Sequence, residues 1–352
     1  MKKRTIGPGQ LAGLVVLSLL TLGTETLPAR LSSAGSAAWL CLLAAGGVFW
    51  LLSGLVIRRP LAGRAVLSGT IRPIRNRSAA AFLLLWGVFV TACHVDRIGR
   101  RLSGDLRGSA LLLSAAALLL AAWMASGGLA ALCRAGQIFG MATGLTLFII
   151  VLFGLPGMRW DRIVLWTGAE LKMIPEGVLQ VIGDLSVGLY ALLFLEDLEM
   201  KGERRQKGRG KITMLFLLLF LGDLLVLGRL GPGLAGEIDR PFFQMVSGLG
   251  FQGAFQRLEE LVSALWLPGD LTLLALLLLS QGRLLAGLTG REESGTMLWI
   301  PALAVLTLVF IRLPGSGWRN SPVMRLCGPA AGTLLVFLAM FSKKSEKNQK
   351  GG

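Results

Sequence analysis

Apolar residues along the chain gather into about ten segments, each of roughly the length that crosses a membrane, with short polar loops between them. A helix satisfies all of its own backbone hydrogen bonds, so it is the element expected where an apolar stretch crosses hydrocarbon. The segments cover residues 9–28, 37–57, 79–95, 109–125, 135–155, 177–198, 212–230, 255–281, 297–313 and 322–341. The pattern predicts an all-α, polytopic integral membrane protein with about ten transmembrane helices.

Positive charge is concentrated in the loops. Of the 352 residues, 53% are hydrophobic and only 16% are charged, and the formal net charge is +16. An excess of Lys and Arg could indicate nucleic-acid binding, but its position between apolar segments is explained better by membrane topology and anionic lipid headgroups. We therefore expect a lipid bilayer, and no nucleic acid, as a partner.

Four basic groups determine the predicted orientation: the start of the chain, the loops at residues 58–77 and 201–211, and the basic tail at residues 343–352. With an even number of spans all four lie on one side, which predicts that both termini are cytoplasmic. Arg97, Arg100, Arg101 and Arg107 fall on the opposite side in this count. Either these arginines bind something there, or one of the predicted spans is wrong.

The first apolar segment carries a polar group near its end, Gly23-Thr24-Glu25-Thr26. Non-helical backbone persists at membrane depth only where it lines a cavity, and an intramembrane carboxylate indicates a functional site by default. We interpret the group as a break in the helix beside a substrate site. The alternative is that the helix ends near Thr21 and that Glu25 lies among the lipid headgroups.

Residues 156–176 are too polar to cross the membrane, and their mixture of Trp and charged residues suits an interfacial segment on the outer face. This segment divides the chain into residues 1–155 and 177–342, as two inverted five-helix repeats would require. The sixth span therefore corresponds to the first, and it too is polar. Its candidate site residues are Gly183, Asp184, Ser186, Tyr190 and Glu196. The Tyr190 ring could lie over a ligand or anchor the helix at the membrane interface.

Few residues of a catalytic or metal-binding type are present. The chain has one His, and its four Cys residues, Cys41, Cys93, Cys133 and Cys327, are dispersed without C-x-x-C spacing. No phosphate-binding glycine loop is visible. We therefore expect no enzyme activity, no cofactor and no metal site. A small solute held between the first and sixth helices is the expected ligand.

A set of short motifs occurs in a fixed order along most of the chain. The motifs are Asp239-Arg240-Pro241-Phe242-Phe243-Gln244-Met245-Val246, Phe255-Gln256-Arg257-Leu258-Glu259, Leu265-Trp266, Gln10, Leu27-Pro28, Ala38-Trp39, and Gly128 with Arg134. Together they resemble the spore germination permease family, the B-type membrane subunits of spore germinant receptors. The sequence departs from the family pattern at Gln244, where glutamate is usual, at Ser247, where arginine is usual, and at Pro268-Gly269-Asp270, which we expect to interrupt the eighth span.

The resemblance implies a member of the amino acid/polyamine/organocation permease superfamily with the leucine-transporter type of fold, whose first and sixth helices unwind at the substrate. It also implies a germinant-receptor subunit in the inner membrane of the spore. Such a subunit binds a small nutrient, an amino acid for example, and acts with an A-type membrane subunit and a C-type lipoprotein. The alternative function is a secondary amino-acid transporter coupled to protons or sodium.

Overall fold

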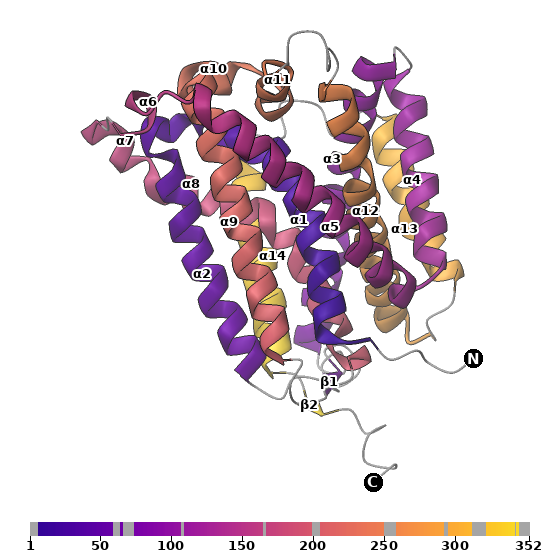
Figure 1. Ribbon diagram of the computed structural model, residues 1–352. Coiled ribbons are helices and arrows are strands. Elements are labelled where there is room, and N and C mark those ends of the chain that lie inside the picture. The colour runs from indigo at the N-terminus through magenta and orange to yellow at the C-terminus, as the bar shows by residue number, and fades with distance from the viewer. Residues whose placement is uncertain are drawn as a thin grey trace.

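Helices make up almost all of the described chain in the computed structural model (Figure 1). The structure describes residues 6–58, 64–65, 74–106, 109–164, 167–198, 205–249, 258–291, 295–311, 322–341 and 343–344. Within these ranges the only strands are the two-residue β1 (Arg64–Ala65) and β2 (Lys343–Lys344), which pair antiparallel. The prediction of an all-α protein is confirmed.

In the described part of the chain, ten long helical segments lie side by side, with α5 crossing the others obliquely (Figure 1). By length and composition, six helical stretches among the described residues can cross a membrane, the longest of which contains both α1 and α2, and three shorter apolar helices lie in α4, α13 and α14. The segments are α1 (Pro8–Leu31), α2 (Ala38–Arg58), α3 (Ile74–Leu106), α4 (Ala110–Ser126), α5 (Leu129–Gly154), α8 (Ile174–Leu185) with η3 (Ser186–Asp197), α9 (Arg205–Leu230), α12 (Leu258–Thr289), α13 (Thr296–Phe310) and α14 (Pro322–Phe341).

The predicted break in the first span is wrong. Helix α1 is continuous through Gly23 and Glu25 and ends only at Leu31. The Thr24 and Thr26 hydroxyls donate to backbone carbonyls four residues earlier, at 2.8 Å each, so they follow the helix instead of unwinding it. The headgroup alternative is also wrong, because Glu25 is only 3% exposed.

Two further helix boundaries differ from the prediction, and both differences have one cause. Helix α3 continues past Val95 to Leu106, through the stretch expected to be a basic loop, and α12 continues through Pro268-Gly269-Asp270, which was expected to interrupt it. In both places charged residues inside a helix lie against opposite charges from other helices. Hydropathy alone ends a span at such residues because it does not register their partners.

Helix α1 lies at the centre and packs against α5, α9 and α12. Small residues permit these close crossings. A Cβ atom at Gly136 of α5 would lie 2.7 Å from the Leu14 Cα, and one at Gly269 of α12 would lie 2.3 Å from the Thr21 methyl group. Close backbone approach through glycine is common between membrane helices, and here it fixes α1 among its neighbours.

Short helices cap one end of the molecule, where Figure 1 places α6, α7, α10 and α11. The segment predicted to be interfacial, residues 156–176, contains most of η2 (Leu155–Gly157), α6 (Asp161–Val164), α7 (Gly168–Lys172) and the start of α8. At this end η1 (Ser32–Ala37) turns the chain from α1 into α2, with Gly35 at a φ of 57°. The Ser36 N–H donates to the Glu170 carboxylate at 3.0 Å, so this turn is tied to α7.

The opposite end carries the basic segments. Strand β1, from the loop between α2 and α3, pairs with β2 beyond α14, and Lys211 Nζ donates to the Gly9 carbonyl at 2.7 Å. These segments therefore share one end, as their predicted common orientation requires. The side of the membrane on which they lie, and the division into repeats at residues 1–155 and 177–342, stay predictions.

Candidate functional site

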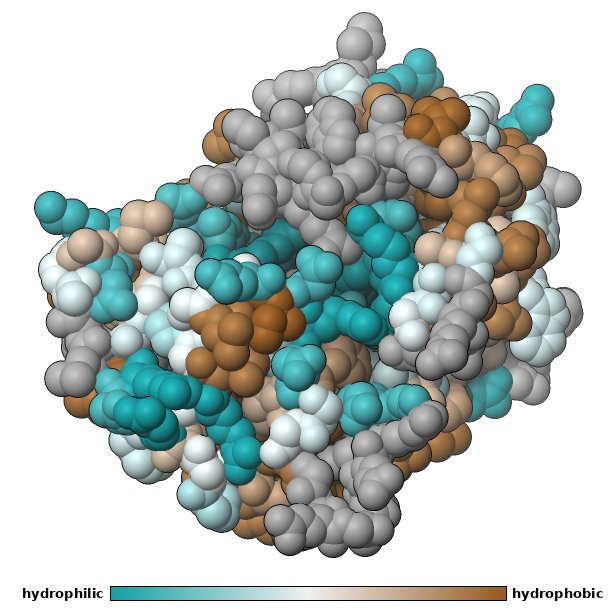
Figure 2. Space-filling model, turned by 90° about the horizontal axis from the view of Figure 1, so that it is seen from above, coloured by the Kyte–Doolittle hydropathy of each residue, from teal (hydrophilic) through white to brown (hydrophobic). Residues whose placement is uncertain are grey.

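A polar cavity of about 620 Å³ opens among α1, α3, α8, α10 (Pro232–Glu237) and residues 238–240, which lead into α11 (Pro241–Ser247). Figure 2 shows the hollow, lined by hydrophilic residues, in the face that carries the short helices. Its volume falls within the range of about 300–1,000 Å³ typical of small-molecule sites. Its charged lining residues are Glu25, Arg30, Arg97, Arg100, Arg101, Asp184, Glu237, Asp239 and Arg240.

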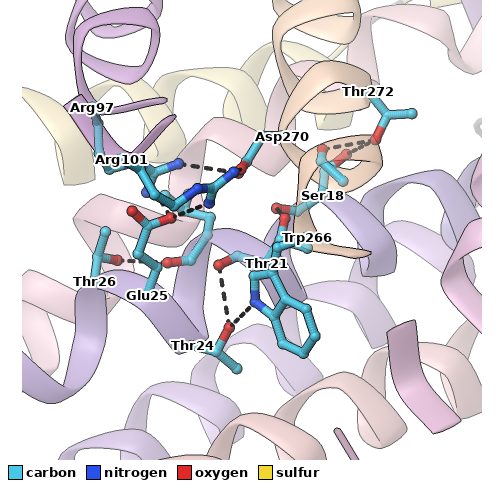
Figure 3. Close-up of polar contacts among 12 residues, drawn as sticks. Ser18, Thr21, Thr24, Glu25, Thr26, Arg97, Arg101, Trp266, Asp270 and Thr272 are labelled. Carbon is cyan, nitrogen blue, oxygen red and sulfur yellow. Dashed lines mark hydrogen bonds and ion pairs between the residues drawn. The ribbon is translucent and has the colours of Figure 1, made fainter. Parts of the chain in front are cut away.

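The cavity floor is a buried cluster of two arginines and two carboxylates (Figure 3). Arg101 bridges the cluster, with Nη1 2.9 Å from Glu25 Oε2 and Nη2 2.5 Å from Asp270 Oδ2. Arg97 Nη2 lies 3.3 Å from Asp270 Oδ1, and its Nε lies 3.8 Å from Glu25 Oε2. The formal charges cancel, which is the condition under which buried charges are tolerated.

Three helices position this cluster. Arg97 and Arg101 are four residues apart on α3, so they project from one face of that helix toward α1 and α12. The Arg101 guanidinium also lies 5.7 Å from the centre of the Phe243 ring, and the Arg101 carbonyl accepts a hydrogen bond of 3.4 Å from Arg240. Helix α11 and the residue that precedes it therefore also contact the cluster.

Arg97 retains unused hydrogen-bonding capacity. A guanidinium has five N–H donors, but Arg97 makes a single hydrogen bond within the described chain, to Asp270. Its Nε and Nη1 atoms have no hydrogen-bond partner there, although the residue is buried and lines the cavity. An anionic group in the cavity beside Arg97 would supply the missing acceptors.

A second ion pair joins Arg30 of α1 to Asp184 of α8 at the cavity wall. Helix α1 therefore contributes both to the cluster at the floor and to the salt bridge at the wall, and Glu25 and Arg30 of α1 line the same cavity. This arrangement can receive a ligand that carries both a negative and a positive group.

Four of the predicted site residues line the cavity: Glu25, Thr26, Gly183 and Asp184. Gly23 and Thr24 lie on another face of α1 instead. A Cβ atom at Gly23 would lie 2.5 Å from Leu219 of α9, and the Thr24 hydroxyl accepts a hydrogen bond of 2.8 Å from the Trp266 indole. These two residues pack α1 against α9 and α12.

The remaining predicted residues lie deeper in the sixth span. Unwinding was expected in this part of the helix. Instead, the α-helix passes at Ser186 into a 3₁₀-helix of 12 residues, which is wound more tightly than an α-helix. The Ser186 hydroxyl donates to the Gly183 carbonyl at 2.6 Å. Tyr190 is buried, donates to the Leu83 carbonyl at 2.7 Å, and lies neither at the cavity lining nor at an exposed interface. The side chain of Glu196 lies outside the described residues.

Sequence reasoning missed Arg97, Arg101 and Asp270 as members of one site. The four-residue spacing of the two arginines was the available signal, because it places both on one helix face. Asp270 gave a weaker signal, a single carboxylate ahead of the apolar run at residues 271–279.

Aromatic residues from two of the motifs that resemble the family, Phe242 and Phe243 in one and Trp266 in the other, form a cluster at the same site. The Phe242 ring lies 5.4 Å from the Trp266 ring at an interplanar angle of 31°, and the Phe243 ring lies 6.4 Å from it at 72°. These contacts hold α11 against α12 beside the charged cluster. Arg257, from the motif at residues 255–259, lies outside the described residues.

No protein family and no curated protein matches the chain in sequence. Solved structures match it in fold. A mutant of the Eremococcus coleocola manganese transporter has a TM-score of 0.62 and 11% identity, over 96% of this chain and 76% of the transporter. MhsT in complex with L-phenylalanine has a TM-score of 0.59 and 15% identity, over 94% of this chain and 95% of MhsT.

Mhp1, a nucleobase-cation-symport-1 family transporter in a closed conformation with bromovinylhydantoin bound, is also similar. Its TM-score is 0.57 at 15% identity, over 96% of this chain and 77% of Mhp1. At these identities the likeness shows the fold alone. The chain is thus an all-α polytopic membrane protein with the leucine-transporter type of fold, as predicted.

Proposed function

We propose that the chain binds a small zwitterionic nutrient, an amino acid, in the cavity between α1, α3 and α8 and carries it across the membrane. The observation that carries the proposal is the Arg97 guanidinium, which lines a cavity of about 620 Å³ with two nitrogen atoms that lack a hydrogen-bond partner in the described chain. A ligand carboxylate would form charge-assisted hydrogen bonds with these nitrogens.

The ligand's ammonium group is assigned to the carboxylates that line the same cavity, Asp184, Glu237 and Asp239. A charged group leaving water needs a counter-charge, and the cavity supplies both signs within one space. The proposal involves no catalytic step, no cofactor and no resident metal.

Secondary transport is supported by the fold. Two of the similar solved structures, the manganese transporter mutant and Mhp1, are named as transporters, and two hold a small molecule, L-phenylalanine in MhsT and bromovinylhydantoin in Mhp1. In this fold two inverted repeats rock around a site near the membrane midplane. The coupling ion in this proposal is a proton or sodium.

Germinant sensing is the second candidate function. The observation that favours it is the cluster of Phe242, Phe243 and Trp266 beside the charged residues, because these aromatic residues belong to the motifs that resemble the spore germination permease family. In this case the same nutrient would shift a conformation read by an A-type membrane subunit and a C-type lipoprotein in the inner membrane of the spore. Such a signal requires different ligand affinities in two conformations.

The test is uptake and counterflow exchange of labelled amino acids in proteoliposomes that contain the purified protein. We expect Arg97→Gln to weaken the apparent affinity for the amino acid at least about tenfold, since the loss of one charge-assisted contact costs roughly 1.5–3 kcal/mol. Arg134→Gln is the matched control, because Arg134 is exposed on α5 and does not line the cavity. Equal affinity in both variants would remove Arg97 from the site.

Sensing is tested in spores that lack the gene, germinated on single amino acids and complemented with wild type or Arg97→Gln. A selective loss of response, restored only by the wild type, supports the receptor role. Normal germination together with uptake in proteoliposomes supports transport alone.

A further inference from the structure

Asp223 of α9 is a buried carboxylate that the proposed ligand site does not use. It is 2% exposed, and neither of its carboxylate oxygens has a hydrogen-bond partner in the described chain. Neighbouring residues on α9 show what surrounds it. Leu219, one turn earlier, packs on Gly23 of α1, and Phe220 lies 6.1 Å from the Trp39 ring of α2. Asp223 therefore lies at a largely apolar junction of three helices.

The other buried acids in the described chain are neutralised by arginine. Glu25 and Asp270 share Arg101, and the partly buried Asp184 and Asp197 pair with Arg30 and Arg283. Among the fully buried acids of the described chain, only Asp223 has no ion pair there. An isolated ionised carboxylate in a low-dielectric interior is so unfavourable that the group takes up a proton instead.

Among the described side chains of the elements packed against α9, no cation is placed to replace that proton. The α2 group within electrostatic range is the Cys41 thiol. On α1, Glu25 and Arg30 already pair with Arg101 and Asp184, on the cavity side. Helix α5 meets α9 through Gly154 and Leu147, and α11 has no ionisable residue. The charges of α6 and α10, namely Asp161, Arg162 and Glu237, lie at the end of α9, where Arg162 bonds to the Arg229 carbonyl.

We propose that Asp223 is the proton-carrying group of the transport cycle. In the conformation described here its carboxyl group holds a proton. When α9 moves relative to α1 and α2 and water enters, the O–H bond breaks, the proton passes to water and the carboxylate remains, until a proton from the other side restores the acid. The inference rests on the proposed transport function and names its coupling ion.

Helix α1 provides the physical link between the ligand and this proton. Glu25 on one face of α1 belongs to the cavity floor, whereas Gly23 and Thr24 on another face pack against Leu219 and Gly222 of α9. A ligand that shifts α1 at the cavity therefore changes the packing around Asp223 within the same helical turn.

The first test asks whether Asp223 holds a proton, and it does not depend on transport. Infrared spectra of the purified protein at neutral pH, in a detergent without ester groups, should show the carbonyl stretch of a protonated carboxylic acid that is lost in Asp223→Asn. Asp184→Asn is the control and should leave that band unchanged, because Asp184 pairs with Arg30. An identical band in wild type and Asp223→Asn would overturn the assignment.

The second test asks whether that proton drives transport. In proteoliposomes, an inward proton gradient should drive amino-acid accumulation by the wild type and by Asp161→Asn, an exposed control on α6. Asp223→Asn should accumulate no more with the gradient than without it, while it keeps counterflow exchange. Wild-type accumulation by Asp223→Asn, or accumulation that follows sodium alone, would overturn the coupling role. If the wild type exchanges no amino acid, the coupling role fails with the proposed function, while the infrared band still decides the protonation state.

Discussion

Glu25 and Asp223 are two buried carboxylates on either side of the same stretch of α1, and they are neutralised in different ways. Glu25 is 3% exposed and forms an ion pair with Arg101 at 2.9 Å. Asp223 is 2% exposed and has no hydrogen-bond partner in the described chain. Burial is thus almost the same on the two sides, and the difference lies entirely in the partners.

The comparison shows why two acids in one membrane domain suit different tasks. The cluster around Glu25 and Asp270 has two guanidinium groups, so each carboxylate faces an arginine and the cluster can hold a fixed pattern of charge at the cavity floor. Asp223 has apolar neighbours, so its charge depends on a proton and on the packing of α9. A fixed charge orients a ligand, whereas a changeable charge can couple two conformations.

The largest expected effect comes from Arg101→Leu, which would leave Glu25 and Asp270 with one arginine between them. Removing one partner of a buried ion pair typically costs about 3–5 kcal/mol of folding free energy. The measurement is the unfolding free energy of the purified protein in mixed micelles. Arg100→Leu is the control, since Arg100 is 39% exposed and pairs with Asp96 at the surface, where a pair is worth about 0–1 kcal/mol.

A double-mutant cycle sharpens this result. Because Glu25→Gln removes the negative charge that Arg101 neutralises, the double variant should lose less stability than the sum of the two single variants. Additive losses would mean that the two side chains do not interact, which would contradict the cluster drawn in Figure 3.

A neutral contact on α1 should matter less. Trp266→Phe keeps most of the aromatic packing with Phe242 but removes the indole N–H that donates to Thr24 at 2.8 Å. The expected loss is about 1 kcal/mol, the usual net value of a hydrogen bond between uncharged groups. Trp123→Phe is the matched control, because Trp123 is 70% exposed on α4. A loss as large as that of Arg101→Leu would mean that the packing of α11, not charge, dominates the site.

The sequence was sufficient to predict the helices but not their partners. Apolar periodicity and loop charge predict ten spans and an all-α membrane fold because these properties are local along the chain. The group around Glu25 looked like a break because its neighbours in sequence are polar. In the fold its charge is met by Arg101, 76 residues away. Contacts over such distances leave no local pattern from which a single sequence could predict them.

Only some of the residues that line the cavity could be predicted from the sequence. Glu25, Thr26, Gly183 and Asp184 line it, as expected from polar residues in the first and sixth helices. The arginines of α3 were assigned to a loop, because a hydropathy window cannot distinguish a charge in water from a charge paired inside a helix bundle. Their four-residue spacing was the better guide.

A smaller effect is expected from Asp223→Asn. The amide has nearly the shape of a protonated carboxyl group, and Asp223 has no hydrogen bond to lose in the described chain, so the unfolding free energy should change by less than about 1 kcal/mol. Asp270→Asn provides the contrast, because it removes a charge on which Arg97 and Arg101 depend. Comparable losses in the two variants would break the distinction between the two carboxylates.

The smallest effect concerns Glu170 of α7, a carboxylate outside the candidate membrane spans, whose charge is stabilised by backbone N–H groups instead of by an arginine or a proton. Burial alone would raise its pKa, but hydrogen bonds from the backbone N–H groups of Thr167 and Ser36, at 2.8 and 3.0 Å, bring the pKa below its ordinary value of 4.5. A carboxyl group whose pKa is lower in the folded state stabilises the fold above its unfolded pKa. That contribution disappears as the pH falls through the folded pKa.

The thermal midpoint of Glu170→Gln should therefore lie slightly below that of the wild type at neutral pH, because the amide accepts hydrogen bonds more weakly than the carboxylate. The two midpoints should converge as the pH falls below 4.5 and through the lowered pKa of Glu170 in the folded state. Asp161→Asn, at an exposed pair with Arg159, is the control and should shift the midpoint less. If the charge on Glu170 matters, the difference between the two thermal midpoints must vanish in acid, where the wild-type carboxylate is protonated. A difference that is the same at every pH would show that the shape of the turn near Gly35, and not the charge on Glu170, holds α7 to the end of α1.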